Sequence, residues 1–411
     1  MSPTSWPLAS WLDVRPRALG VLLPLTGSYG HVGNGALQAL QLALEGLEGL
    51  TLVVRDTAGD ARQAAAMARE LVADGRVVAI LGPVGRLETA ESLAVTRPLG
   101  IPHVTLGSQL ERVPSTVPGA LDPAVRVRTS PEELARAVAR HAVLEVGLKR
   151  LAVLAPEERA EGTSTPLGPA ARQAAAFVEE VVRLGAAHAR TSCYEPETKD
   201  FRLAAEGLLP VGVGGPGRRP KDVRPDFDGL FIPDTAARVR RIVPFLEFAG
   251  IMPRTRPSGA GVQLLGGAGW HHASVIDRGT GLTDNAIFAD TWLSEAAADL
   301  RPDAFTRRFE AAAKQRPGPF HAEVHDAARL LGVAVAGASA GDVADVRGEV
   351  LRRLLTAGPQ AGVTGILAFA LGEPIPRARL LTVHGDTLRE RVSEEEEATL
   401  RDAPPVGGGK N

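Results

Sequence analysis

ALGVLLPLTGSYG, the stretch at residues 18–30, joins a continuous apolar run to a loop of small and polar residues. A short apolar run of this kind is typical of a strand that is buried on both faces. Apolar residues then recur at helical spacing between Gly33 and Leu47. The stretch therefore predicts a strand, a loop and a helix, which together open a parallel α/β sheet.

The same alternation continues along the chain. Apolar runs predict further strands at residues 50–54, 77–81 and 102–106, and helical spacing predicts helices at residues 61–73 and 88–99. Strands that alternate with helices form βαβ units, for which right-handed crossovers are expected.

A second series begins after Ser130, which precedes Pro131, Glu132 and Glu133. This is a favourable helix start, because a hydroxyl caps the helix and the acids lie near the positive end of its dipole. Helices are expected from there to about residue 146 and at residues 169–184, 200–209 and 236–248, and strands at residues 150–155, 187–194, 228–232 and 262–265. Two consecutive series predict an α/β protein with two Rossmann-like lobes, each with a parallel sheet.

The last third of the chain mixes elements. Helices are predicted at residues 304–314, 321–336 and 343–355, and strands at residues 285–291, 365–371 and 379–383. A run of four glutamates and three successive glycines near the C-terminus indicates a solvated tail.

Composition excludes several classes of protein. Of the 411 residues, 44% are apolar and 23% are charged, which excludes a disordered chain, and the single cysteine excludes a disulfide-stapled mini-protein. The formal net charge of −2 gives no overall basic field for nucleic acid. No apolar stretch is long enough to span a membrane. Residues 1–16 lack the apolar run of a secretory signal, which leaves a cytoplasmic protein or a mature form open.

Three motifs suggest chemistry but fit simpler explanations better. Residues 212–217 match a dinucleotide fingerprint by letter, but Pro216 and Pro220 prevent the helix that the motif needs, so a flexible insertion is expected. His321 and His325 could chelate zinc at their i, i+4 spacing, but no third ligand is apparent nearby. Cys193 is expected to be a buried apolar thiol. Because no nucleophile elbow or phosphate loop occurs either, no catalytic residue, metal or cofactor is expected.

Candidate binding residues lie in loops that follow the predicted strands, where open α/β sheets bind ligands. If two lobes face each other across a cleft, these loops line it. Hydroxyl groups and helix N-termini would bind a carboxylate, and Asp234 or Glu157 would bind an amine. A helix cap and a turn would explain each loop taken alone. The candidate ligand contacts are Thr26, Tyr29, Arg86, Thr105, Ser108 and Gln109 from the first series, and Glu157, Asp234 and Trp270 from the second.

These loops carry a resemblance to a family. Val21–Gly30 resembles the opening strand and loop of type I periplasmic binding proteins of the leucine/isoleucine/valine-binding kind. Their acidic turn, their next strands and parts of their second lobe are similar to residues 56–60, 79–83, 100–105, 194–201 and 226–232. The resemblance covers about residues 17–391.

The resemblance implies two lobes joined by three crossovers, near Arg128, Asp290 and Leu371, with a ligand between the lobes and hinge closure over it. The implied domains are an N-terminal extension (1–16), lobe I (17–128 and 291–371), lobe II (129–290 and 372–392) and a flexible acidic and glycine-rich tail (393–411). The implied function is non-enzymatic capture of an amino-acid-like or peptide-like solute in the periplasm or cell envelope, for an ABC transporter or a sensor.

One departure from the family keeps an alternative open. Amino-acid-binding members carry a serine-rich loop after the residues that match Gly82 and Pro83, whereas this chain has Gly85 and Arg86. Arg86 could still bind a carboxylate as a bidentate fork. The loop is also similar to that of the C-terminal domain of penicillin-binding protein activator lipoproteins. That resemblance implies an interaction module that contacts a peptidoglycan synthase.

Overall fold

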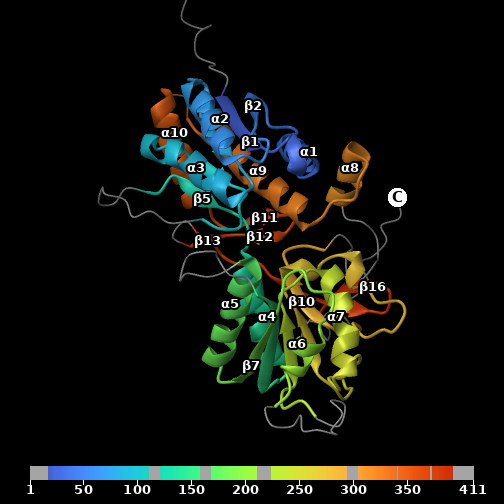
Figure 1. Ribbon diagram of the computed structural model, residues 1–411. Coiled ribbons are helices and arrows are strands. Elements are labelled where there is room, and N and C mark those ends of the chain that lie inside the picture. The colour runs from blue at the N-terminus through green and yellow to red at the C-terminus, as the bar shows by residue number, and fades with distance from the viewer. Residues whose placement is uncertain are drawn as a thin grey trace, which may run out of the picture. The chain divides into compact units, whose positions relative to one another are not determined.

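The computed structural model describes residues 17–110, 121–157, 168–210, 224–293, 304–339, 341–370 and 373–391. The chain divides into two units, each of which is made of separate stretches of sequence (Figure 1). Unit 1 comprises Met1–Ser130 and Thr291–Arg377, and unit 2 comprises Pro131–Asp290 and Ala378–Asn411. The predicted N-terminal extension and tail, and the glycine motif at 212–217, lie outside the described residues.

Unit 1 is built on a five-stranded sheet with the order β2-β1-β3-β4-β5. All of its paired strands are parallel. The strands are β1 (Arg17–Leu23), β2 (Leu50–Asp56), β3 (Val77–Leu81), β4 (His103–Thr105) and β5 (Ala124–Arg126). Strand β1 lies between β2 and β3, and residues on both of its faces are buried under helices, which explains the uninterrupted apolar run in its sequence.

Helices cover both faces of this sheet. Leu19, Val21 and Leu23 of β1 belong to the core cluster that also contains residues of α1, α9 and α10. Ala18 and Leu22 point to the other face, where they pack with α2. The period of two residues along β1 therefore separates two cores. The helices are α1 (Gly30–Leu44), α2 (Ala61–Ala73), α3 (Arg86–Thr96), α8 (Ala304–Ala313), α9 (Pro319–Gly337) and α10 (Val343–Leu355), with the short turns η1 (Gly27–Tyr29) and η2 (Arg97–Leu99).

The C-terminal part of unit 1 forms two small antiparallel hairpins beside the main sheet. Their strands are β11 (Gln360–Gly362), β12 (Gly365–Leu367), β13 (Phe369–Ala370) and β14 (Glu373–Pro374). The single strand that the sequence predicts at residues 365–371 is thus divided between the two hairpins.

Unit 2 contains a seven-stranded sheet with the order β16-β15-β10-β9-β8-β6-β7. Its first five strands along the chain are parallel, and β15 and β16 add an antiparallel edge. The sheet is therefore mixed, whereas the sequence predicts a parallel one. The strands are β6 (Arg150–Pro156), β7 (Ala187–Tyr194), β8 (Gly229–Ile232), β9 (Gln263–Gly266), β10 (Ile287–Asp290), β15 (Arg379–His384) and β16 (Thr387–Glu390).

The helices of unit 2 also lie on both faces of its sheet (Figure 1). Phe177 of α5 stacks on Phe231 of β8 with 4.1 Å between the ring centroids, inside the core that α4 and α5 share with the sheet. The opposite face is covered by α6 and α7. The helical elements are α4 (Pro131–Arg140), a π-helical turn η3 (His141–Glu145), α5 (Pro169–Arg183), α6 (Arg202–Glu206), α7 (Ala236–Phe248), η5 (Ala268–Trp270) and η6 (Ala273–Val275).

Candidate functional site

The carboxyl ends of β1 and β2 are tied together by one carboxylate. Asp56 accepts hydrogen bonds from the Thr26 hydroxyl at 2.6 Å and from the backbone amides of Leu25 and Ala58, each at 2.8 Å. Burial opposes ionisation of Asp56, but these hydrogen bonds outweigh it and lower its pKa. Thr26 is exposed, and its hydroxyl hydrogen is used by Asp56. Tyr29, 60% exposed, lies against Gly59 in the next loop.

The loop after β3 leads directly into helix α3. The backbone amide of Gly82 donates to Val104 of β4 at 2.9 Å, and the amide of Leu106 donates to Pro83 at 3.1 Å, so the loops after β3 and β4 are bonded to each other. Gly82 has a φ of +100°, and a Cβ there would lie 2.0 Å from the Leu22 carbonyl oxygen. Only glycine fits this position without displacing the backbone.

Arg86 is the first residue of α3 and is exposed. The buried Glu88 carboxylate accepts from the Gly85 amide at 3.0 Å and from the Thr57 hydroxyl at 2.5 Å. Glu88 thus fixes the start of the helix. The guanidinium of Arg86 and the N-terminus of α3 both contribute positive potential at this point.

Two buried hydroxyls lie beside this junction. Thr105, at the end of β4, is fully buried, and Thr89 in α3 is 4% exposed. Neither hydroxyl has a hydrogen-bond partner among the described residues. The Thr89 hydroxyl lies next to Gly107, where a Cβ would come within 3.2 Å of it. Because a buried hydroxyl without a partner is costly, both are suited to a bound water or ligand. Ser108 and Gln109 follow in the same loop and are half-buried.

A buried histidine supports the loop from below. His103 of β4 is fully buried. Its Nε2 lies 2.5 Å from the Gly82 carbonyl oxygen and its Nδ1 lies 2.9 Å from the Thr96 hydroxyl. A carbonyl oxygen can only accept, so Nε2 carries the proton and Nδ1 accepts from Thr96. Burial lowers the pKa of His103 to about 4.

We expect this histidine to make stability depend on pH. Its pKa is lower in the folded state than the ordinary 6.5. The unfolded chain therefore binds more protons between these values, and the free energy of unfolding falls as the pH drops from 7 to 4. His103 contributes roughly 3 kcal/mol to this fall at most. Urea denaturation at pH 7, 5.5 and 4 should give a shallower pH dependence for His103→Gln than for the wild type.

The histidine His141, whose pKa burial also lowers to about 4, gives a comparison for that experiment. His384→Gln, at an exposed position of β15, is the control for the substitution itself. An unchanged dependence in His103→Gln would contradict the assigned tautomer and its buried neutral state.

In unit 2 the predicted residue Asp234 follows β8 and is held by three neighbours. Its Oδ2 accepts from the Tyr194 hydroxyl at 2.6 Å and lies 2.9 Å from Arg238 Nε, and its Oδ1 accepts from the Thr235 amide at 2.6 Å. Burial, together with the bond to Asp234, raises the pKa of Tyr194, which keeps the phenol as a donor. Glu157 follows β6, is half-buried, and its amide donates to the Tyr194 carbonyl at 2.8 Å.

Trp270, another predicted contact, has no exposed surface in this structure. Its Nε1 donates to the Ile232 carbonyl at 2.9 Å, and its ring packs against Phe288. A Cβ at Gly266 would lie 2.3 Å from the indole, so glycine at this position makes room for the ring. Trp270 therefore fills the space behind the loop after β9 and shapes it from inside.

The structure thus places the predicted residues in two groups, one at the carboxyl edge of each sheet. The sequence reasoning did not single out Thr89, His103, Tyr194 or Arg238, although they hold these loops or lie against them. For Arg238 the signal was its position four residues after Asp234. For His103 and Tyr194 the sequence gives no signal, because Gly82 and Asp234, to which they are bonded, lie 21 and 40 positions away along the chain.

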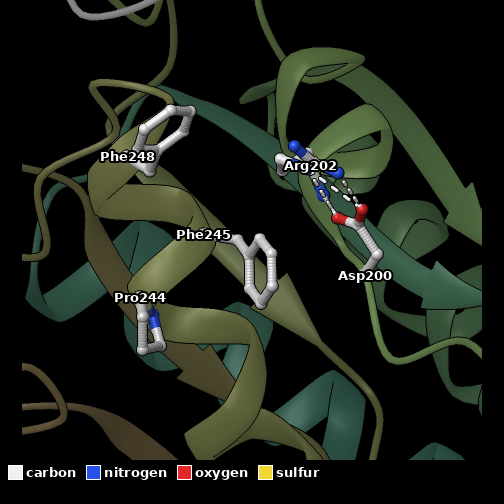
Figure 2. Close-up of a pocket in the computed structure, with 5 residues that line it drawn as sticks. All are labelled: Asp200, Arg202, Pro244, Phe245 and Phe248. Atoms are coloured by element: carbon white, nitrogen blue, oxygen red, sulfur yellow. Dashed lines mark hydrogen bonds and ion pairs between the residues drawn. The ribbon is translucent and has the colours of Figure 1, made fainter.

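Unit 2 also has a pocket of about 570 Å³ that the sequence did not predict. Figure 2 shows Phe245 reaching from α7 toward the ion pair that Arg202 forms with Asp200. The phenyl ring of Phe245 also packs on Phe201, whose ring packs on Tyr194. The lining residues are Asp200, Arg202, Pro244, Phe245 and Phe248.

The histidines considered for zinc lie on α9 and pack against aromatic rings. His321 lies 4.8 Å from Phe309 and His325 lies 5.0 Å from Phe305, measured between ring centroids. Within the part of the chain that the structure describes, no group of three or more metal-ligating side chains occurs.

The expectation for Cys193 is wrong, because this cysteine is exposed. It lies in β7, at the edge of its sheet, where one face of the strand is open to solvent.

Comparison with known proteins confirms the predicted fold. Residues 17–190 match a family model described as periplasmic binding protein. A search of curated proteins gives no match. No helix among the described residues is long and apolar enough to cross a membrane.

Three solved structures illustrate the similarity. A protein from Rhodospirillum rubrum assigned as a branched-chain amino acid ABC transporter is 20% identical, with a TM-score of 0.71 over 91% of this chain and 99% of that one. A substrate-binding protein from Desulfitobacterium hafniense in complex with Leu is 19% identical, with a TM-score of 0.63 over 91% and 99%. A solute-binding protein from R. palustris in complex with benzoate is 18% identical, with a TM-score of 0.59 over 91% and 94%.

Proposed function

We propose that this protein is a non-enzymatic, solute-binding component of an ABC transport system or a sensor, located in the periplasm or cell envelope. Its ligand is a small solute that carries a carboxylate. The fold is that of two-lobed periplasmic binding proteins. The ligands named for two structural neighbours, Leu and benzoate, share only a carboxylate and an apolar body.

The junction of the loops after β3 and β4 is the observation that carries the proposal. It combines an exposed guanidinium at the start of α3 with the buried hydroxyls of Thr89 and Thr105. A helix N-terminus and an arginine both favour a carboxylate, and the hydroxyls can donate to its oxygens. Thr26, Tyr29, Ser108 and Gln109 would complete the contacts of unit 1. Ligand capture between the lobes and hinge closure stay predictions from the sequence.

A thermal-shift screen against amino acids, their deaminated counterparts, short peptides and cell-wall fragments tests this function. A ligand present at about 100 times its Kd stabilises the folded state by roughly 2.7 kcal/mol, which is easily detected. Shifts with carboxylate-bearing solutes support the proposal. No shift across the panel would count against it and favour the alternative derived from the sequence, contact with a peptidoglycan synthase, which a pull-down from envelope extract would then examine.

For any solute found, Arg86→Ala should lower the affinity measured by calorimetry at least tenfold, because a charged hydrogen bond is lost. Arg69→Ala is the matched control, since Arg69 is exposed on α2 of the same unit. Equal affinity in Arg86→Ala and the wild type would remove Arg86 from the site.

A further inference from the structure

We propose that unit 2 holds a separate binding site, for a neutral aromatic molecule, in the pocket where the start of α6 meets α7. The volume of this pocket, about 570 Å³, lies within the range of about 300–1,000 Å³ that is usual for small-molecule sites. All of its lining residues belong to unit 2, and none of them is a candidate contact for the carboxylate-bearing solute. The inference therefore goes beyond the proposed function and does not depend on it.

The aromatic wall of the pocket is the last of three rings that pack edge to face. The ring centroids of Tyr194 and Phe201 lie 5.1 Å apart at an interplanar angle of 85°, and those of Phe201 and Phe245 lie 5.6 Å apart at 69°. Tyr194 and Phe201 are buried, whereas Phe245 is half-buried and reaches into the pocket (Figure 2). The position of the Phe245 ring is thus fixed by packing, and a ring bound in the pocket would continue the series.

A second phenyl group lines the pocket one turn further along α7. Phe248 is 65% exposed, and its ring packs on no other aromatic ring among the described residues. Pro244 adds a further apolar surface. A flat apolar ligand that covers Phe245 and Phe248 removes both rings from water, and aromatic pairs gain more than their buried area alone provides. These side chains therefore favour an aromatic ligand over an aliphatic one.

The polar side of the pocket carries no net charge. Arg202 donates from Nε and Nη2 to the carboxylate of Asp200, so the two charges neutralise each other. Because these bonds use Nε and Nη2, Nη1 can donate to a ligand oxygen. Pro244 has no amide hydrogen, so the carbonyl of Arg240, one turn earlier in α7, lacks its usual helical donor. An ionised ligand would lose hydration without gaining a net counter-charge, whereas a phenol or an aryl amide would lose less.

Three probes of similar size test this inference without using a carboxylate. Benzamide is neutral and aromatic, cyclohexanecarboxamide lacks the aromatic ring, and benzamidine carries a positive charge at pH 7. Ligand-detected NMR titrations on the full chain would give the Kd of each probe. Benzamide should bind at least fivefold more tightly than either of the other two. Absence of benzamide binding, or equal or tighter binding of one of the other probes, would overturn the inference and leave the proposed solute site untouched.

Phe248→Ala connects the binding to this pocket. Because Phe248 is exposed, the variant should fold, and loss of its ring should weaken benzamide binding at least fivefold. Phe248→Tyr keeps the ring and should retain the affinity of the wild type. Val182→Ala is the matched control, since Val182 is an apolar residue of α5 that is 57% exposed and does not line the pocket. Wild-type affinity in Phe248→Ala would show that benzamide binds elsewhere and would overturn the assignment.

Sedimentation velocity examines the competing occupant, a second copy of the chain. We expect the wild type and Phe248→Ala to sediment alike. A dimer that forms in the wild type and dissociates in Phe248→Ala would assign the pocket to self-association and would overturn the inference.

Discussion

Replacing Asp326 by alanine is expected to lower the free energy of unfolding by about 3–5 kcal/mol. Asp326 is 1% exposed in α9 and accepts hydrogen bonds from the Val363 amide at 2.7 Å, the Thr364 amide at 2.8 Å and the Thr364 hydroxyl at 2.6 Å. It also lies 4.0 Å from Nη1 of the buried Arg377. Alanine would leave two backbone amides unbonded and a buried guanidinium without this counter-charge.

Denaturation in urea at pH 7, followed by circular dichroism, measures this loss. Asp345→Ala is the control, since Asp345 is exposed in the first turn of α10 and should cost less than about 1 kcal/mol. A loss for Asp326→Ala as small as that of the control would show that the hydrogen bonds of Asp326 are replaced by solvent.

Asp326 lies near Arg377, a residue at a point where the chain passes from unit 1 to unit 2. Burial lowers the pKa of Arg377, and the nearby Asp326 and Glu323 oppose this effect. Arg377 is the last residue of unit 1 before the chain enters unit 2, and its Nη2 donates to the Val127 carbonyl at 3.1 Å. Arg128 donates to Glu323 at 2.6 Å. Two carboxylates of α9 therefore hold two of the points where the chain leaves unit 1.

Trp270→Ala is expected to destabilise the protein by about 3–5 kcal/mol, because a fully buried indole is removed from a packed core. Trp270→Phe should cost less, since the ring remains, although the Ile232 carbonyl then loses its donor. Phe248→Ala, at an aromatic residue that is 65% exposed, should change stability little. Urea denaturation measures the free energy of unfolding of the three variants, and the expected loss is largest for Trp270→Ala, smaller for Trp270→Phe and smallest for Phe248→Ala.

The same variants decide what Trp270 does. A large loss of stability identifies it as a core residue that shapes the loop after β9. Unchanged stability with loss of ligand binding would instead make it the direct contact that the sequence suggested.

Much of the fold was predictable because burial leaves a signal in the sequence. The apolar run of β1 and the helical spacing of α2 and α7 gave elements close to those observed. The short strands β5 and β14 were missed, because two or three residues are too few to show a period. The edge strand β16 was missed too, since its residues are partly exposed and need no apolar pattern.

The candidate site was less predictable. Residue types at strand ends indicated where polar groups gather, but their partners depend on the fold. Thr26 is bonded to Asp56, which lies thirty positions later in the chain. Asp234 looked like an acceptor for an amine, yet Tyr194, forty positions earlier, and Arg238 occupy it. The sequence did not show which side chains are exposed either. Cys193 was expected to be buried and is exposed, and Trp270 was expected to contact a ligand and is fully buried.

The exposed position of Cys193 has a practical consequence. It is the single cysteine of the sequence and it precedes Tyr194, the residue that bonds to Asp234. A maleimide fluorophore can therefore be attached at one defined place without introducing or removing any cysteine. A dye at this place lies one residue from Tyr194, so the sequence already carries a single attachment point for an optical probe at the carboxyl end of β7.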